Sequence, residues 1–202
     1  MNPFPGKSVV GLTGGIACGK TFVLEILAKN GWEAISTDKL SREILETDTQ
    51  IADLIIERWG DSIFDERGID KKQIAEIVFS SSHERFWLES ILHPLVRTAW
   101  QTKIEKSKNS LIVVEIPLLF ENDLQSQFAH VISLFASREI QLGRLLERGL
   151  PNKQAEGRLD AQLPNERKAE RADSVFLGDG GCEFLERQVL FFLNSFSSKY
   201  QH

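Results

Sequence analysis

The sequence predicts an α/β fold in which a five-stranded parallel sheet is flanked by helices, and three observations support this prediction. Short apolar runs recur without the alternation of a half-exposed strand, which is typical of strands covered on both faces. Segments with helical apolar spacing lie between these runs, as expected for strands joined by helices. A glycine-rich turn follows the first run, where a strand would pass into a helix.

The elements can be assigned in order along the chain. Strands are predicted at the four continuous apolar runs, 9–12, 111–114, 131–135 and 175–177, and a fifth is expected before Ser36-Thr37-Asp38. Helical spacing is shown by Leu142, Leu145 and Leu146, and again by Leu185, Val189, Phe192 and Phe196. Since helical segments separate the strands, the sheet is predicted to be parallel.

Two segments interrupt this regular order. Residues 37–108 have helical periodicity and no strong buried strand, so we expect a helical insertion into a core formed by 1–36 and 109–202. Within the insertion, His93-Pro94 is expected to interrupt a helix that begins near Ser82. Residues 148–164 combine glycine, proline and many charges, and we expect a mobile flap that contains a short helix.

Length and composition exclude several classes of protein. The chain has 202 residues, of which 42% are hydrophobic and 26% are charged, as in soluble globular proteins. No apolar run approaches the roughly 20 residues that cross a bilayer, and the first residues lack a signal-peptide pattern, so we expect a cytoplasmic protein without a membrane partner. The net charge of −5 argues against a nucleic-acid partner. We expect a monomer or a weak homo-oligomer.

The glycine-rich turn carries the most specific motif. Residues 14–21 read GGIACGKT, a complete match to G-x-x-x-x-G-K-[ST]. Glycines allow backbone N–H groups to surround a phosphate, and the positive end of the following helix adds to the attraction. In this motif Lys20 reaches the β- and γ-phosphates and the Thr21 hydroxyl can bind Mg²⁺. The fold is therefore predicted to be that of the P-loop NTPases, with ATP bound by Gly14, Gly15, Ile16, Ala17, Cys18, Gly19, Lys20 and Thr21.

Other sequence features narrow the class of P-loop protein. A GTPase would need an N-K-x-D guanine motif, but the nearest string, NKQA at 152–155, lacks the aspartate. A translocating ATPase would be expected to end a later strand in Asp-Glu, whereas the strand predicted at 111–114 here ends in Glu115-Ile116-Pro117. The small kinases remain. In these proteins a helical insertion holds the acceptor and an arginine-bearing lid, here about 148–164, closes over the phosphates.

Motifs along nearly the whole chain resemble the dephospho-CoA kinase family. They are GLTGGI at 11–16, Asp38 with Leu40 and Arg42, LHPLVR at 92–97, IPLLFE at 116–121, and Gln162 with Ala172-Asp173. The resemblance implies transfer of phosphate from ATP to the ribose 3′-hydroxyl of dephospho-CoA, the last step of coenzyme A synthesis. Two alternatives stay open: a kinase of another nucleotide-like or small hydroxyl acceptor, and a nucleotide-binding regulatory module without turnover.

The chain also departs from the family pattern. The usual Gly-Ser pair is replaced by Ala17-Cys18, and alanine is tolerable there only with a negative φ. Cys18 stands at a helix N-terminus, a position that can lower the pKa of a thiol. Further replacements are Ser36-Thr37-Asp38 for a D-x-D pair, Glu115 for an aspartate, Lys71 for an arginine and Gly178 for an asparagine near the adenine.

Candidate catalytic residues follow from position and resemblance. Asp38 is expected to accept a hydrogen bond from the attacking 3′-hydroxyl, with helix capping as the alternative. Lys20 is expected to act with it. Arg144 and Arg148 lie one helical turn apart and can both point toward the γ-phosphate, or can form a solvated basic face. Of the two, Arg148 is expected to act in catalysis and Arg144 to help bind ATP.

The acceptor is expected to contact three further residues, His93, Arg97 and Glu121. Two of them have a simpler interpretation, because His93 can hydrogen-bond a broken helix and Glu121 can be a loop carboxylate with its own hydrogen-bond partners. Glu115 and Glu121 could each hold Mg²⁺ through water or orient the acceptor. Surface solvation is the expectation for most of the remaining lid-side cations, Arg158, Arg167, Lys168 and Arg171.

Overall fold

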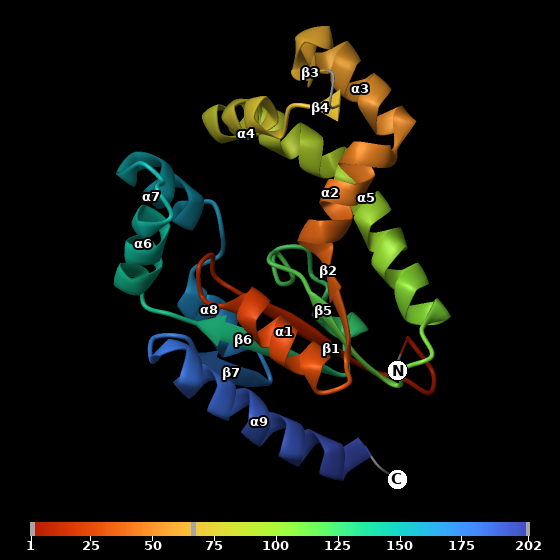
Figure 1. Cartoon of the computed structure of the whole chain (residues 1–202), viewed down its shortest axis with the longest axis vertical. Coiled ribbons are helices and arrows are strands. Elements are labelled where there is room, and N and C mark those ends of the chain that lie inside the picture. The colour runs from red at the N-terminus through yellow and green to blue at the C-terminus, as the bar shows by residue number, and fades with distance from the viewer. Residues whose placement is uncertain (1–2, 66–67, 201–202) are drawn as a thin grey trace. The chain divides into compact units, whose positions relative to one another are not determined.

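The computed structural model describes residues 3–65 and 68–200 and divides the chain into two compact units (Figure 1). One unit combines the residues up to Ser36 with those from Ile104 onward. The other unit is Thr37–Lys103. The second boundary falls inside a helix that ends at Lys106, so a single element runs from one unit into the other.

The first unit is built on a five-stranded parallel sheet, which confirms the predicted fold class. Its strands are β1 (Ser8–Gly14), β2 (Glu33–Ser36), β5 (Leu111–Glu115), β6 (His130–Phe135) and β7 (Ser174–Leu177). Their order across the sheet is β2-β5-β1-β6-β7, and every neighbouring pair is parallel. The central strand β1 is almost entirely buried, which accounts for its continuous apolar sequence.

Helices connect and cover these strands (Figure 1). They are α1 (Lys20–Lys29), the 3₁₀ helix η2 (Gln125–Gln127), α6 (Arg138–Glu147), α7 (Asn152–Asp160), α8 (Asn165–Arg171) and α9 (Gly181–Tyr200). Helix α8 packs against β1 and β6, and α1 packs against α9. No helix among the described residues is long and apolar enough to span a membrane.

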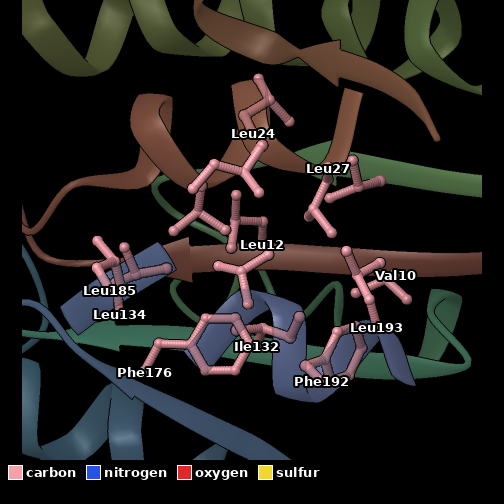
Figure 2. Close-up of a cluster of buried hydrophobic side chains, with 14 of the residues drawn as sticks. Val10, Leu12, Leu24, Leu27, Ile132, Leu134, Phe176, Leu185, Phe192 and Leu193 are labelled. Carbon is pink, nitrogen blue, oxygen red and sulfur yellow. The ribbon is translucent and has the colours of Figure 1, made fainter. Parts of the chain in front are cut away.

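The main hydrophobic core lies between the sheet and two helices, α1 and α9. Figure 2 shows Leu24 and Leu27 of α1 and Phe192 of α9 together with side chains of β1, β6 and β7. Burying each such side chain stabilises the fold by about 1.5–3 kcal/mol. This core fixes α1 against the end of β1, so the turn that joins them is held at both ends.

The second unit is mainly helical. Its elements are α2 (Thr37–Thr47), α3 (Thr49–Trp59), the 3₁₀ helix η1 (Asp61–Ile63), β3 (Phe64–Asp65), β4 (Gly68–Ile69), α4 (Lys71–Ser80) and α5 (Ser82–Lys106). Two aspartates cap helices, since Asp48 accepts backbone N–H groups at the start of α3 and Asp70 does so at α4. The unit has its own core of Ile51, Ile55, Ile63, Ile74, Leu88 and Leu92.

The expected helix break at His93-Pro94 is wrong, because α5 continues through Pro94. Proline inside a helix costs about 3 kcal/mol, since it removes one backbone hydrogen bond and crowds the preceding turn. The buried side chains of α5 recur every fourth residue, at Leu88, Leu92, Val96, Trp100 and Ile104. Their burial contributes about 1.5–3 kcal/mol each, which outweighs the cost of the proline.

Candidate nucleotide-binding site

The P-loop, residues 14–19, turns sharply between β1 and α1. Gly14 and Gly19 have φ values of 134° and 102°, a region that favours glycine. A Cβ on Gly14 would lie 2.4 Å from the Leu134 carbonyl oxygen of β6, so no side chain fits there. The glycines of the motif are therefore required by the backbone that surrounds them.

Ala17 also has a positive φ, 62°, so the expectation of a negative φ at this position is wrong. A left-handed conformation costs an alanine roughly 1–2 kcal/mol. The Ala17 side chain is buried in a cluster with Leu145 of α6 and Ala155 of α7. Burial of its methyl group stabilises the fold by about 0.8 kcal/mol and offsets part of the cost of the left-handed conformation.

Lys20 is the first residue of α1 and folds back over the loop. Its Nζ donates hydrogen bonds to the carbonyl oxygens of Gly14, at 3.0 Å, and Gly15, at 2.8 Å. Thr21 follows in the first turn of α1 and is exposed. The ammonium and the hydroxyl named by the motif thus lie at the loop and at the positive end of α1.

Arg144 joins the P-loop to the turn that follows β7. Its Nη1 donates to the carbonyl oxygen of Ala17 at 3.0 Å, and its Nη2 donates to that of Gly178 at 2.7 Å. A Cβ on Gly178 would lie 2.5 Å from the Cys18 carbonyl oxygen, so this turn packs directly on the loop. Arg148, one helical turn later, is exposed at the end of α6.

Three amide side chains from beyond α1 also hold the loop. Gln141 of α6 donates to the Ile16 carbonyl oxygen at 2.7 Å, and Gln162 accepts the Ile16 N–H at 3.2 Å. Asn165 accepts the Gly15 N–H at 3.0 Å. Sequence reasoning missed Gln141 and Asn165, because neither belongs to a motif and each meets its partner only in the folded chain.

Cys18 is fully buried within the loop. Its Sγ accepts a hydrogen bond from Asn165 Nδ2 at 3.3 Å. Burial raises the pKa of the Cys18 thiol, and this effect exceeds the opposing influence of the Lys20 and Arg144 charges. The pKa of this thiol is therefore shifted in the opposite direction to the lowering that a helix N-terminus can produce.

Lys168 is fully buried, so the expectation of surface solvation is wrong for this residue. Its Nζ donates to the Pro117 carbonyl oxygen at 2.6 Å and pairs with Glu121 at 2.8 Å. Glu121 also accepts the Leu163 N–H at 2.9 Å. The carboxylate expected to bind the acceptor thus has structural partners, at the point where residues 117–121 meet the end of the lid.

Glu115 is the buried last residue of β5. In the register of the sheet it lies opposite Leu12 of β1 and Ser36 of β2. The carboxyl ends of parallel strands are where ligands bind in open α/β sheets. A carboxylate therefore stands at this edge of the first unit.

The predicted catalytic residue Asp38 and the predicted acceptor-binding residues His93 and Arg97 belong to the second unit. Asp38 is exposed in the first turn of α2, as the second residue of the helix. It differs in this from Asp48 and Asp70, which precede their helices and accept backbone N–H groups. His93 is half-buried on α5, and Arg97 is exposed one turn later on the same side of the helix.

The chain resembles known proteins over nearly its whole length. A family model described as Dephospho-CoA kinase matches residues 8–183. A dephospho-CoA kinase of Thermosynechococcus vestitus is 38% identical over 183 residues, covering 89% of this chain and 90% of that protein. A dephospho-CoA kinase of Legionella pneumophila is 35% identical over 193 residues, covering 95% and 94%.

Solved structures agree with these relatives. TT1252 from Thermus thermophilus has a TM-score of 0.77 at 27% identity, covering 94% of this chain and 97% of that one. A dephospho-CoA kinase from Campylobacter jejuni has a TM-score of 0.65 at 27% identity, with the same coverage. Shikimate kinase from Acinetobacter baumannii, with a TM-score of 0.54 at 15% identity, shares the fold. Since the family model spans most of the chain and the relatives are covered almost end to end, the protein belongs to the dephospho-CoA kinase family.

Proposed function

We propose that the protein transfers the γ-phosphoryl group of ATP to the ribose 3′-hydroxyl of dephospho-CoA, forming coenzyme A. The use of ATP as phosphoryl donor is supported by the P-loop at 14–19, where Lys20 Nζ donates hydrogen bonds to the carbonyl oxygens of Gly14 and Gly15. The choice of dephospho-CoA as acceptor is supported by the family to which the chain belongs and by the names of its relatives. Both cysteines are free thiols, which suits the reducing cytoplasm that we propose as its location.

The residues of the first unit would bind and neutralise the phosphates. Lys20 supplies a positive charge next to the loop, and the N-terminus of α1 adds a partial one. Arg144 already donates to two backbone carbonyls, so we assign it to shaping the loop. Arg148, which is exposed at the end of α6, is the arginine we assign to the charge that develops on the transferred group.

Asp38 would orient the attacking hydroxyl. Its carboxylate is exposed in the first turn of α2 and can accept a hydrogen bond from the 3′-hydroxyl. We assign His93 and Arg97 to binding of the acceptor. Both lie on one side of α5, and a guanidinium is well suited to the phosphate groups of a nucleotide-like acceptor.

The residues of the chain fit a magnesium ion held mainly through the nucleotide. Among the residues that the structure describes, no three His, Cys, Asp or Glu side chains are grouped as a metal site. Mg²⁺ usually keeps several waters and binds one or two carboxylates together with substrate phosphates. The Thr21 hydroxyl and the Glu115 carboxylate are the groups we assign to it. The ion would neutralise charge on the β- and γ-phosphates.

A comparison of acceptors tests the proposal. Purified protein with Mg-ATP is given dephospho-CoA, AMP, CMP or shikimate, and ADP release is measured for each. We expect dephospho-CoA to be phosphorylated far faster than the others and coenzyme A to appear as the product. Equal turnover of AMP would point to a different nucleotide-like acceptor. ATP binding without ADP release for any acceptor would favour a regulatory module.

A further inference from the structure

The middle of the P-loop is held by side chains from a later part of the first unit. Asn165 contacts Gly15 and Cys18, Gln141 contacts Ile16, and Arg144 contacts Ala17. Each residue of the 15–18 segment therefore has an anchor outside the loop. This arrangement does not follow from the G-x-x-x-x-G-K-[ST] motif, which contains none of the anchors.

Asn165 uses both ends of its amide in these contacts. Its Oδ1 accepts the Gly15 N–H at 3.0 Å, while its Nδ2 donates to the Ala136 carbonyl oxygen at 2.9 Å and to Cys18 Sγ at 3.3 Å. The Ala136 contact fixes the amide to the connection between β6 and α6. The side chain thus ties two points of the loop to the body of the first unit.

Gln141 stands beside Asn165 against the same glycine. Both side chains are buried, with 4% of Gln141 and 7% of Asn165 exposed. A Cβ on Gly15 would lie 2.3 Å from Gln141 Nε2 and 3.2 Å from the Asn165 amide. The absence of a side chain at Gly15 therefore creates the space in which these two amides reach the loop backbone.

The loop needs such anchors because one of its residues is strained. Ala17 has a φ of 62°, which is unfavourable for alanine, whereas Gly14 and Gly19 adopt positive φ values that glycine tolerates. Strained conformations persist only where the surrounding structure fixes them. Since a P-loop binds phosphates through its backbone N–H groups, the affinity for ATP depends on how far the loop is pre-organised.

We propose that Asn165 and Gln141 are positioning residues for ATP, which hold residues 15–18 in the phosphate-binding conformation. They act on the nucleotide through the loop backbone. The inference rests on the proposed use of ATP by this site. It predicts that loss of either amide weakens ATP binding selectively and leaves the binding of the acceptor unchanged.

Binding measurements on Asn165→Ala and Gln141→Leu test the proposal. Calorimetry gives Kd for Mg-ATP and for dephospho-CoA, each measured separately, and thermal unfolding gives Tm. For each variant we expect Kd for ATP to rise about tenfold, which corresponds to about 1.4 kcal/mol, and Kd for dephospho-CoA to change less than twofold. Turnover at saturating ATP should stay within about threefold, so that KM for ATP carries most of the loss.

Asn30→Ala is the matched control. Asn30 Nδ2 also donates to a backbone carbonyl oxygen, that of Ile26 at 2.8 Å, but at the far end of α1. This variant should lower Tm without changing Kd for ATP. If Asn165→Ala does not fold, Gln141→Leu decides the question alone.

Two results would overturn the inference. One is parent-like ATP affinity in the folded variants, and the other is an equal loss of affinity for ATP and dephospho-CoA. A parent protein that binds ATP but does not phosphorylate dephospho-CoA would contradict the proposed acceptor and leave the binding comparison intact. Failure of this inference can therefore be distinguished from failure of the proposed function.

Discussion

Lys20 is the single residue on which the proposed chemistry depends most directly. Lys20→Ala removes a charge that becomes more important as the phosphoryl group is transferred, so we expect a cost of roughly 3 kcal/mol or more, about a hundredfold in rate. Turnover with dephospho-CoA measures this loss. Lys29→Ala, which removes the basic residue from the last turn of the same helix, should keep parent-like turnover. A folded Lys20→Ala protein within fivefold of the parent would contradict the assignment.

Ala17 tests how the loop tolerates a side chain at positive φ. Ala17→Gly relieves roughly 1–2 kcal/mol of strain but loses a buried methyl group and gains unfolded-state entropy, so we expect a net change in stability within about 0.5 kcal/mol. Ala28→Gly, inside α1, should instead cost about 1 kcal/mol, because glycine is a poor helix former. Chemical denaturation measures both. Equal losses at the two positions would show that strain at Ala17 is negligible.

Lys168 shows how a buried charge can organise a segment. Lys168→Met leaves Glu121, whose side chain is 22% exposed, without its cation. We expect a loss of about 2 kcal/mol, which is less than for a fully buried pair because solvent reaches the carboxylate. Arg167→Met is the control, since its ion pair with Glu170 is largely exposed to solvent and should contribute much less to the free energy of unfolding. Similar unfolding free energies for the two variants would contradict this role.

At the scale of elements, Glu84 links α5 to α3 inside the second unit. Arg58 donates to its carboxylate through Nε and Nη2, and Trp59 Nε1 donates at 2.7 Å. The hydrogen bonds from Arg58, then those from Trp59 and His83, hold the pKa of Glu84 at about 2, below its ordinary value of 4.5. The pair therefore stabilises the fold above pH 4.5, and this contribution is lost as pH falls toward 2.

Glu84→Gln isolates that contribution. The variant should unfold at a lower temperature than the parent near pH 6, and the difference should shrink between pH 4.5 and about 2, because the parent carboxylate becomes protonated there. Glu76→Gln, which replaces a carboxylate on α4, serves as the reference for the general effect of acid. A difference between parent and Glu84→Gln that stays constant across this range would exclude the ion pair as its cause.

Sequence patterns predicted those elements whose structure is determined by residues that are neighbours in the chain. Strand β1, the loop at 14–19 and helix α1 follow one another in sequence, and their predicted order is confirmed. The predicted helix break at Pro94 was wrong. The local cost of proline is outweighed by the burial of side chains along the whole of α5, and a rule based on one residue does not include that burial. The raised pKa of the Cys18 thiol also depends on the folded surroundings, because burial outweighs the nearby positive charges of Lys20 and Arg144.

The anchors of the site could not be predicted from sequence. Asn165 meets Gly15 across 150 residues of chain, and Gln141 meets Ile16 across 125. Lys168 resembles any other lysine of a charged helix until the fold places it against Pro117. These contacts exist because α8 packs against β1 and β6 and α6 reaches the P-loop through Gln141, so only the three-dimensional arrangement identifies them.

At the scale of the whole chain, the residues assigned to the reaction come from two separate units. The P-loop and Lys20 belong to the first unit, whereas Asp38 is the second residue of the second unit, shortly after β2 in sequence. Orientation of the hydroxyl requires an anion at this position, while helix capping requires only a hydrogen-bond acceptor. Asp38→Asn separates the two, because asparagine caps about as well as aspartate and lacks the charge.

We expect Asp38→Asn to lower turnover of dephospho-CoA by roughly a hundredfold or more, with ATP affinity and Tm close to those of the parent. Acceptor-dependent ADP release, ATP binding and thermal unfolding measure the three quantities. Asp48→Asn is the matched control, because Asp48 caps α3 through the N–H groups of Gln50 and Ile51, and it should be parent-like in all three. Asp48→Ala should lose on the order of 1 kcal/mol of stability and keep its turnover. Near-parent turnover by Asp38→Asn would remove Asp38 from the mechanism, because capping alone would then account for its presence at the start of α2.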